Sequence, residues 1–275
     1  MTQVCIVVLN WNGWSDTIEC VRSLRKQNYK NSSLVVIDNA STDGSVEQIR
    51  QALPDVDLIS SGRNLGFGGG CNIGMRQALA RGADYIWLIN SDAHADPDAL
   101  GAMVRQAEQF PLLGAVGSVL YEPDRPGQVQ LWGGGRVQLW WGSSRHLSGP
   151  GRLDFVSGAS VLLRCRALEA VGLFDEKAYF MYWEDTDLSF RLRAAGWAIG
   201  VAQNAKVWHR ESSSLGKGSP QLDLYFTQSA IRFLRKYAKY PLVPIFMMLS
   251  RMFLKRLMLW DWRRVQAVVK GYREA

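Results

Sequence analysis

The sequence has few cysteines and histidines, and it has no apolar run long enough to span a bilayer. The four cysteines are scattered, without the close pairs of a zinc site or the regular spacing of a disulfide framework, so we expect a reducing compartment. The apolar run at 242–249 is far shorter than the roughly 20 residues that a transmembrane helix needs. The N-terminus lacks the charged leader and the cleavage site of a signal peptide. Its apolar stretch at 4–9 is instead predicted to be a first strand.

The net charge of +7 is concentrated at the C-terminus. Residues 231–275 contain 11 Lys and Arg against 2 Asp and Glu, whereas residues 1–230 contain 21 basic and 23 acidic side chains. A basic excess confined to one end predicts contact with an anionic surface there. Nucleic acid is not an expected partner.

Short β-branched runs alternate with helical patterns along the first 110 residues. The predicted strands are 4–9, 34–37 and 84–89, and the predicted helices are 16–27, 45–53 and 97–109. This alternation is typical of βαβ units, which form a mostly parallel sheet covered by helices on both faces. Ligands are then expected at the loops that follow the strands.

The second half of the chain has a different pattern. Residues 121–151 are rich in Gly, Pro, Trp and Arg, which predicts an irregular segment with short strands, as a wall of the site. A strand is predicted at 155–164 and a helix at 186–195. Ser212 to Ser214 and Gly216 to Pro220 mark a loop or linker. We therefore predict a catalytic domain at 1–215 and a basic, amphipathic, membrane-associating helical segment at 216–275.

Asp38 ends the second predicted strand and opens a polar loop at 38–45. A carboxylate at that position can accept hydrogen bonds from a nucleobase or a ribose. Asp43 or Ser45 is the expected cap of the following helix, and Asp38 precedes that cap by too many residues to serve as one. We therefore predict that Asp38 contacts a ligand.

Residues 64–74 are dense in glycine and lead into a predicted helix. Exposed backbone N–H groups at such a place can bind a diphosphate. Gly66 and Gly68 match part of a dinucleotide-binding fingerprint, but Cys71 occupies the third glycine position and the loop lies far from the first strand. A structural turn is the alternative for this segment.

Asn90, Ser91 and Asp92 follow a buried strand at 86–89. With Asp96 as a helix cap and Pro97 in the first turn, Asp92 is expected in a short loop above the sheet. Hard divalent cations prefer carboxylate oxygens and keep positions open for a diphosphate, so Asp92 is a predicted metal ligand. The alternative is an ordinary polar turn.

Three carboxylates, Glu184, Asp185 and Asp187, lie between an aromatic stretch at 179–183 and the predicted helix. Like charges held close together can raise the pKa of a carboxyl group toward the range of a general base. Asp185 or Asp187 can also cap the helix, and the two roles can coexist.

His209 follows a predicted strand at 198–202 and precedes the Ser-rich loop. An imidazole there can complete the metal coordination that Asp92 begins. His94 and His146 have no comparable setting, and we expect them in local turns or on the surface.

Taken together, five segments resemble family 2 glycosyltransferases, in particular the rhamnosyltransferase-like branch that builds bacterial surface polysaccharides such as O-antigen. The resemblance covers roughly residues 3–215. The segments are VLNWNG (8–13), VIDNASTDGS (36–45), NLGFG (64–68), LINSD (88–92) and EDTDL (184–188).

The resemblance implies a GT-A fold, with a nucleotide-binding α/β sheet, and a requirement for Mg²⁺ or Mn²⁺. It implies that Asp185 is the general base, with Glu184 and Asp187 shaping its environment, and that Asp92 and His209 bind the metal or the diphosphate. The implied nucleotide-sugar contacts are Asn10, Asn12, Asp38, Asn39, Asn64, Gly66, Asn72, Asn90 and Ser91. Asn90 departs from the pattern, because many relatives of the wider fold carry the first carboxylate of Asp-x-Asp there. An amide oxygen is a weaker ligand, so the metal is expected to depend more on the diphosphate and His209.

The implied reaction inverts the anomeric centre. An acceptor hydroxyl attacks the anomeric carbon, Asp185 takes its proton, and the metal offsets the charge on the departing nucleoside diphosphate. By resemblance, the donor is a dTDP-linked deoxysugar such as rhamnose, or a UDP-sugar. The acceptor is a hydroxyl of a polyprenyl diphosphate-linked saccharide.

Residues 241–260 alternate apolar and basic side chains, which predicts an amphipathic helix lying in the plane of a membrane. Trp260 and Trp262 would lie at the interface, and the cations, Arg256 among them, would face anionic headgroups. The expected location is the cytoplasm, at the inner face of the cell membrane. The alternative is a core helix packed on the catalytic domain.

Two other function classes share some of these features. A nicotinamide-dependent oxidoreductase also uses a parallel sheet and a glycine-rich loop, but residues 10–13 lack its fingerprint after the first strand. A non-catalytic sugar-binding or membrane-binding relative would lose Asp92 or Asp185, and both are present.

Overall fold

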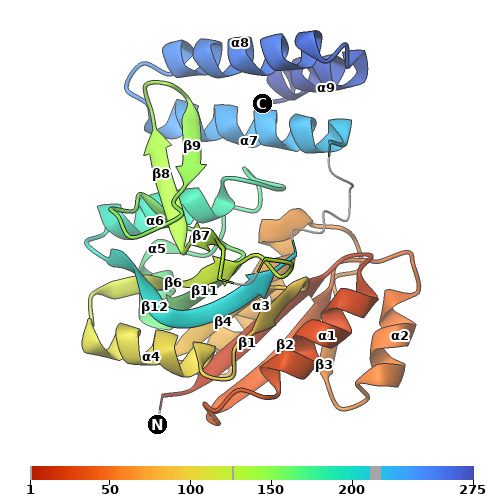
Figure 1. The fold of residues 1–275 in the computed structure, drawn as a ribbon, viewed down its shortest axis with the longest axis vertical. Coiled ribbons are helices and arrows are strands. Elements are labelled where there is room, and N and C mark those ends of the chain that lie inside the picture. Colours follow the sequence, from red (N-terminus) through yellow and green to blue (C-terminus); the bar gives the residue numbers. More distant parts are fainter. Residues whose placement is uncertain (1, 126, 211–217) are drawn as a thin grey trace.

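The computed structural model describes residues 2–125, 127–210 and 218–275. Within them, one nine-stranded sheet has the order β3-β2-β1-β4-β11-β6-β12-β5, with β7 beside β6 (Figure 1). Its strands are β1 (Val4–Asn10), β2 (Ser32–Asp38), β3 (Asp57–Ser60), β4 (Tyr85–Asn90), β5 (Ala93–Ala95), β6 (Leu113–Tyr121), β7 (Val129–Trp132), β11 (Ser160–Arg164) and β12 (Ala198–His209).

The sheet is mostly parallel, as the sequence predicts. Strands β3, β2, β1 and β4 pair in parallel, and β12 is parallel to β6. Strand β11 is antiparallel to both β4 and β6, so β6 runs in the same direction as β4. The carboxyl ends of β1, β2 and β4 therefore meet at one edge, where Asn10 is paired with Asp38 and Leu9 with Asn90.

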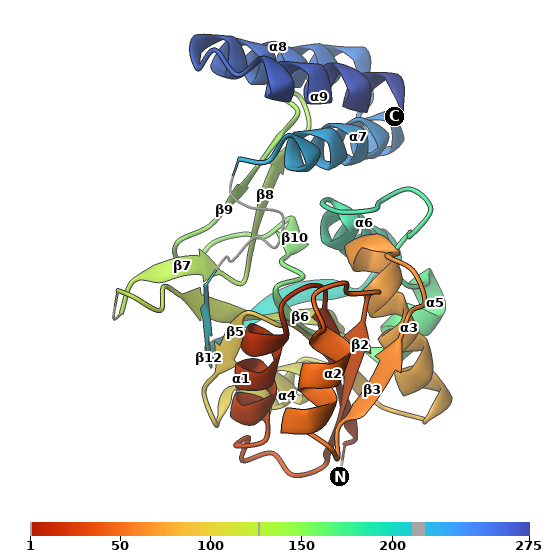
Figure 2. The same cartoon turned by 90° about the vertical axis from the view of Figure 1, so that its right-hand side faces the viewer.

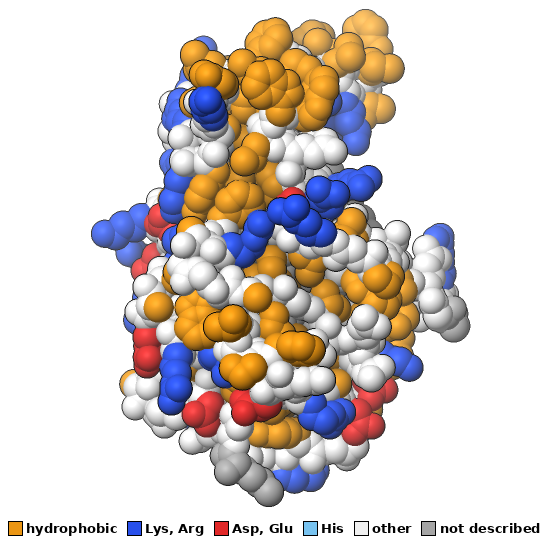
Figure 3. Space-filling model, turned by 90° about the vertical axis from the view of Figure 1, so that its left-hand side faces the viewer, with side chains coloured by type: hydrophobic (Ala, Val, Ile, Leu, Met, Phe, Trp, Pro, Cys, Tyr) orange, Lys and Arg blue, Asp and Glu red, His pale blue; other side chains and the backbone are white. Residues whose placement is uncertain are grey.

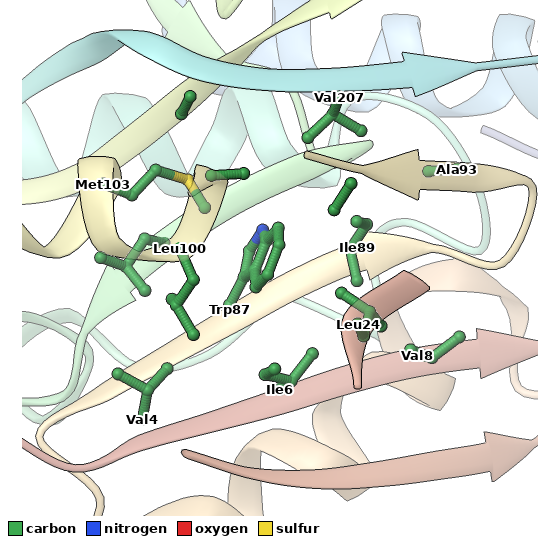
Figure 4. Close-up of a cluster of buried hydrophobic side chains, with 14 of the residues drawn as sticks. Val4, Ile6, Val8, Leu24, Trp87, Ile89, Ala93, Leu100, Met103 and Val207 are labelled. Carbon is green, nitrogen blue, oxygen red and sulfur yellow. The ribbon is translucent and has the colours of Figure 1, made fainter. Parts of the chain in front are cut away.

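Helices cover both faces of the sheet. The cluster on one face includes α1 (Trp14–Leu24), α2 (Ser45–Ala52) and α4 (Ala99–Gln109). The cluster on the other face includes α3 (Gly66–Ala80), α5 (Cys165–Val171) and α6 (Glu184–Ala194). Side chains of β4 alternate between the two, and Trp87 packs against Leu100 and Met103 of α4 on the first face (Figure 4). Its indole N–H donates to Ser160 Oγ at 3.0 Å, so this buried donor is satisfied.

The predicted strand at 155–164 is wrong as a single element. It is divided into β10 (Phe155–Val156) and β11, because Ser157 N turns away to donate to Gly133 O while Ala159 O accepts from Asn90 N. Strand β10 instead joins β8 (Gly134–Gln138) and β9 (Ser143–His146) in a second sheet. The irregular segment at 121–151 thus contains short strands, as expected.

The C-terminal region forms α7 (Pro220–Tyr237), α8 (Leu242–Met258) and α9 (Trp262–Arg273). They stack as a helical layer beyond α6, seen in both views (Figures 1 and 2). None of the helices in the described ranges has the length and apolarity needed to cross a membrane. The predicted linker residues 212–217, and with them the predicted boundary at 215/216, lie outside the described residues.

Candidate active site

Asn10 and Asp38 form a buried pair at the ends of β1 and β2. Asn10 Nδ2 donates to Asp38 Oδ1 at 2.8 Å and to Ser41 Oγ at 3.0 Å, and Asn10 Oδ1 accepts from Thr17 Oγ1 at 2.7 Å. Asp38 Oδ2 also accepts from Ser41 N at 3.1 Å. These bonds fix the orientation of the Asp38 carboxylate, and Ser41 and Thr17 are contributors that the sequence reasoning missed.

Asn12 and Asn39 shape the loops beside that pair. Asn12 has a left-handed backbone (φ 51°), and its side-chain oxygen accepts from Thr42 N at 2.7 Å. Asn39 Nδ2 donates to Asn64 Oδ1 and Gly66 O, both at 3.0 Å, and its oxygen accepts from Leu65 N. Asn39 therefore ties the end of β2 to the turn that begins α3.

The glycines of α3 serve close packing, which corrects the prediction of an exposed phosphate-binding loop. Gly68, Gly69 and Gly70 are buried inside the helix. A Cβ on Gly70 would lie 2.5 Å from Leu9 Cδ1, and one on Gly74 would lie 2.4 Å from Val7 Cγ1. Gly66 N donates to Asn64 Oδ1, so its N–H already has a partner within the protein. The missing side chains let α3 lie directly on β1.

Asn72, on the same helix, is buried and bonded within the protein. Its amide nitrogen donates to Phe174 O at 2.9 Å and to Glu176 Oε2 at 2.6 Å, and its oxygen accepts from Phe174 N at 3.1 Å. Both N–H donors of the amide are thereby used. The structure thus gives Asn72 the role of fastening α3 to the segment at 174–176, where the sequence analysis placed a nucleotide-sugar contact.

Asp92 and His209, predicted to act together, are adjacent. His209 Nε2 lies 3.2 Å from Asp92 Oδ1 and 3.2 Å from Asn90 Nδ2. Ser91 lies in the same turn, between β4 and β5. Both Asp92 and His209 are largely shielded from solvent, with side-chain exposures of 12% and 10%. The carboxyl end of β4 and that of β12 thus converge on one point.

Gln130 of β7 sets the tautomer of His209, and the sequence reasoning did not identify it. Gln130 Nε2 donates to His209 O at 3.1 Å, so the other amide atom, Oε1, accepts a hydrogen bond from His209 Nδ1 at 3.0 Å. In the neutral ring, Nε2 then carries a lone pair, and both Asn90 Nδ2 and Asp92 Oδ1 lie 3.2 Å from it. Two electron-rich atoms that face each other are a suitable pair of ligands for a cation.

The donor set fits a divalent ion that a bound diphosphate would also coordinate. Within the described part of the chain, no group of three or more His, Cys, Asp and Glu residues could hold a metal ion. Two protein ligands with open positions are the arrangement that Mg²⁺ and Mn²⁺ adopt when substrate phosphates complete the coordination.

Asp185 is the second residue of α6 and lies near the same edge of the sheet. Its Oδ2 accepts from Gly158 N at 2.8 Å, and the next residue, Ala159, accepts from Asn90 N. Its Oδ1 accepts from Thr186 N at 2.6 Å. Burial raises the pKa of Asp185 despite the opposing effect of the hydrogen bonds from Gly158 and Thr186. A carboxylate with a raised pKa is a stronger base, as a proton acceptor requires.

Glu184, the first residue of α6, is also buried, but it lacks the hydrogen bonds that Asp185 receives from Gly158 and Thr186. Its Oε2 has no hydrogen-bond partner within the described ranges. Burial, and secondarily the charge of Asp185, raise the pKa of Glu184 well above its usual value. Burial therefore favours the uncharged form of Glu184, the form that places no second negative charge beside Asp185.

Asp187, predicted to shape the environment of Asp185, anchors α6 to its neighbours. Its side chain is fully buried and accepts from Lys236 Nζ at 2.7 Å, Tyr237 Oη at 2.8 Å and Arg191 Nε at 2.7 Å. Burial opposes its ionisation, but the hydrogen bonds from Lys236 and Arg191 outweigh burial and lower the pKa of Asp187. It fastens α7 to α6, and so acts on Asp185 only through the helix.

Helix α7 also holds the turn that delivers Asp185. Tyr182 and Trp183, just before α6, both have left-handed backbones, with φ of 69° and 70°. Such non-glycine residues cost about 1–3 kcal/mol each and persist only where the surroundings enforce them. Ser229 Oγ donates to Met181 O at 2.8 Å, and the Phe233 ring centroid lies 4.7 Å from that of Trp183. The strained turn is therefore stabilised from α7.

Comparison with known proteins agrees with this geometry. Residues 5–172 match the model of glycosyl transferase family 2. The chain is also 32% identical, over 213 residues, to N-acetylglucosaminyl-diphospho-decaprenol L-rhamnosyltransferase of Mycobacterium tuberculosis, covering 67% of this chain and 68% of that protein. The chain belongs to glycosyltransferase family 2.

One further relative and one solved structure are similar to the chain. A galactofuranosyltransferase of Mycobacterium tuberculosis is 30% identical over 186 residues, which cover 64% of this chain and 60% of that protein. A mannosyltransferase from Pyrobaculum calidifontis, in complex with GDP-Man and Mn²⁺, has the same fold, with a TM-score of 0.62 and 17% identity over 98% of this chain and 73% of that one. This family 2 glycosyltransferase therefore has the GT-A fold, and the oxidoreductase alternative is set aside.

Proposed function

We propose that this glycosyltransferase moves a sugar from a nucleoside diphosphate to a hydroxyl of a lipid-linked saccharide, with inversion at the anomeric carbon. The observation that carries the proposal is the meeting of two groups at one edge of the sheet. The backbone N–H of Asn90 donates to Ala159 O, and the residue before Ala159, Gly158, donates its own N–H to Asp185. The side-chain amide of Asn90 lies beside His209 Nε2. A base and a cation site are thus held at opposite sides of one residue.

The chain's own residues divide the chemistry between them. Asp185 accepts the proton of the attacking hydroxyl, while its bonds to Gly158 and Thr186 keep the carboxylate in place. Asp38, oriented by Asn10, contacts the nucleoside, and Asn12 and Ser91 are placed in neighbouring turns. Asp92 and His209 would hold a Mg²⁺ or Mn²⁺ ion, which would offset charge on the leaving diphosphate.

The proposed donor is a dTDP-linked deoxysugar such as rhamnose, with UDP-sugars as the second class. The similarity to the rhamnosyltransferase supports both the deoxysugar and a polyprenyl diphosphate-linked acceptor, since the name of that enzyme specifies a rhamnosyl group and a diphospho-decaprenol acceptor. Because the chain is also similar to a galactofuranosyltransferase, a furanose donor must be included among the donors tested. Such a reaction would be a step in the assembly of a surface polysaccharide such as O-antigen.

The catalytic unit, we infer, extends beyond the predicted boundary at 215. Asp187 of α6 is bonded to Lys236 and Tyr237, and Arg232 Nη1 donates to Ala178 O at 2.7 Å, so α7 packs on the domain as one wall of its core. Helices α8 and α9 form the membrane-associating part, at the inner face of the cell membrane. A protein ending near residue 215 would lose the support of the turn at 182–183 and is expected to be inactive.

The test is a transfer assay with a panel of donors. The purified full chain is incubated with Mn²⁺, polyprenyl diphosphate-linked N-acetylglucosamine and, in parallel, dTDP-rhamnose, UDP-hexoses and a nucleotide-linked galactofuranose. Mass analysis identifies the accepted donor, and the anomeric coupling constant of the product reports the stereochemistry. Transfer with inversion supports the proposal, whereas a product that retains the donor configuration contradicts it.

A further inference from the structure

The tip of the β8–β9 hairpin lies against α8, although about 100 residues separate them in sequence. Arg251 Nη2 donates to Trp141 O at 2.6 Å and to Gly142 O at 3.2 Å. Gly142 has a left-handed backbone (φ 59°), and a Cβ there would lie 2.3 Å from Pro244 O. The hairpin, expected as a wall of the site, therefore extends to the C-terminal helices, as both ribbon views show (Figures 1 and 2).

Large apolar side chains are exposed on both elements. Trp140 and Trp141 at the hairpin tip are 60% and 48% exposed, and Phe246 and Leu254 on α8 are 68% and 61% exposed. Leu242, Leu257, Met258, Leu259 and Trp260 are exposed as well. On α8, the exposed Leu242, Phe246, Leu254 and Met258 are four or eight positions apart, opposite the buried Ile245, Met248 and Met252, so they lie on one face of the helix. Figure 3 shows hydrophobic side chains gathered over this helical layer with Lys and Arg beside them.

The same two elements contain no acidic residue. Neither 136–153 nor 239–260 has an Asp or a Glu, whereas Arg145, Arg251 and Lys255 are exposed there. Not all of the basic side chains are available to contact anionic headgroups. Arg256, which was expected to do so, is instead paired within the protein. Arg256 and Arg264 both bind the buried Asp223, so they hold the three C-terminal helices together.

The exposed apolar side chains and the basic side chains beside them indicate which kind of partner binds here. A second copy of the chain, docked through the same face about a two-fold axis, would bring basic rims together with no carboxylate to pair them. An anionic bilayer matches both properties, because tryptophans favour the interface and Lys and Arg are attracted to lipid phosphates.

We infer that the tip of the β8–β9 hairpin and the outer face of α8 form a single docking face for an anionic lipid surface. The inference rests on the membrane association proposed above for α8 and extends it to the hairpin tip. The two tryptophans of the hairpin insert at the interface beside Phe246 and Leu254. Arg251, which donates to the hairpin backbone, holds the two elements together.

The experiment is vesicle flotation of the full chain without donor or acceptor. Vesicles contain either phosphatidylcholine alone or phosphatidylcholine with phosphatidylglycerol. The unchanged protein is expected to float with the anionic vesicles and to be released by salt. The double variant Trp140→Ser/Trp141→Ser should lower the partition coefficient about tenfold or more, and Phe246→Ser/Leu254→Ser should act similarly. The control is Phe110→Ser/Leu112→Ser, which changes two exposed apolar residues next to α4 at the other end of the molecule and should leave flotation unchanged.

Three results would overturn the inference. They are undiminished flotation of the Trp140→Ser/Trp141→Ser protein, equal binding to uncharged vesicles, or a dimer in sedimentation velocity that the same double variant abolishes. Circular dichroism of each variant verifies that it is folded. Because no sugar substrate is present, these outcomes are separate from the donor panel, in which the double variant should still use a water-soluble acceptor at the normal rate.

Discussion

His209 Nε2 lies 3.2 Å from Asp92 Oδ1, while the opposite ring nitrogen of His209 faces Gln130 Oε1 at 3.0 Å. The imidazole is thus held from both sides, and its orientation is independent of any bound ligand. The two residues come from the ends of β12 and β4, which are far apart in sequence and meet only because β5 pairs with β12. A cation site at this point is therefore a product of the sheet topology.

Replacing Gln130 should weaken metal binding without touching a ligand. Gln130→Leu removes the acceptor that keeps the proton on His209 Nδ1, and such supporting residues typically contribute about 10–100-fold to metal affinity. Mn²⁺ binding is measured by electron paramagnetic resonance in the presence of a nucleoside diphosphate, and the tautomer by ¹⁵N shifts of the ring without metal. Gln128→Leu, an exposed neighbour just before β7, is the matched control. Unchanged tautomer and affinity in Gln130→Leu would show that the glutamine plays no such part.

The transfer rate should rise with pH through the raised pKa of Asp185. The carboxylate must be ionised to accept a proton, so kcat/KM falls on the acid side as Asp185 becomes protonated. Because burial raises the pKa of Asp185, that fall begins at a higher pH than the ordinary aspartate value of 3.8 would give. The measurement is kcat/KM against pH at saturating Mn²⁺. An acid limb at or below the ordinary value would contradict the burial argument.

Glu184→Gln should stabilise the protein increasingly as the pH rises. The folded state raises the pKa of Glu184, so it binds the proton more tightly than the unfolded chain does, and stability is lost as pH rises above 4.5 through the raised value. A neutral glutamine of the same shape removes that loss. Urea unfolding at pH 5 and pH 8 measures the difference between the two proteins. A gap that is the same at both pH values would mean that Glu184 ionises normally in the folded protein.

Much of the fold could be predicted from local patterns. Strands β1, β2 and β4 and helices α1, α2, α4 and α6 are near their predicted positions, because β-branched runs and helical periodicity are local properties. Asp92 and His209 could be paired because each follows a strand of the same predicted sheet. The four cysteines are free and buried, in agreement with the absence of a disulfide pattern.

Other features depend on contacts that no local pattern contains. The glycines at 66–74 are as compatible with a phosphate loop as with close packing, and only the proximity of Leu9 and Val7 decides between them. Asp187 carries the same motif signal as Asp185, yet Lys236 and Tyr237, about 50 residues later, bind it. Gln130 lies in a segment without periodicity, so nothing in the sequence links it to His209.

Asp187→Ala should destabilise the protein by about 2–4 kcal/mol, since it breaks a buried carboxylate network whose partners Lys236 and Arg191 are only partly exposed. The effect is greatest at neutral pH, because a lowered pKa contributes stability that is present above 3.8 and lost as pH falls through the lowered value. Chemical denaturation gives the free energy of unfolding, and kcat is expected to fall as α6 loosens. Asp55→Ala, at an exposed ion pair with Arg25, is the control and should change little. A stable and fully active Asp187→Ala protein would rule out the anchoring role.

In the proposed mechanism, the ionised carboxylate of Asp185 removes the proton of the acceptor hydroxyl. The most direct test is the single-turnover transfer rate of Asp185→Asn at saturating donor, acceptor and Mn²⁺. We predict a fall of about 10²–10⁴-fold with donor binding preserved, because the amide keeps the shape of the side chain but cannot act as a base. Transfer by Asp185→Asn at the unchanged rate would contradict the account.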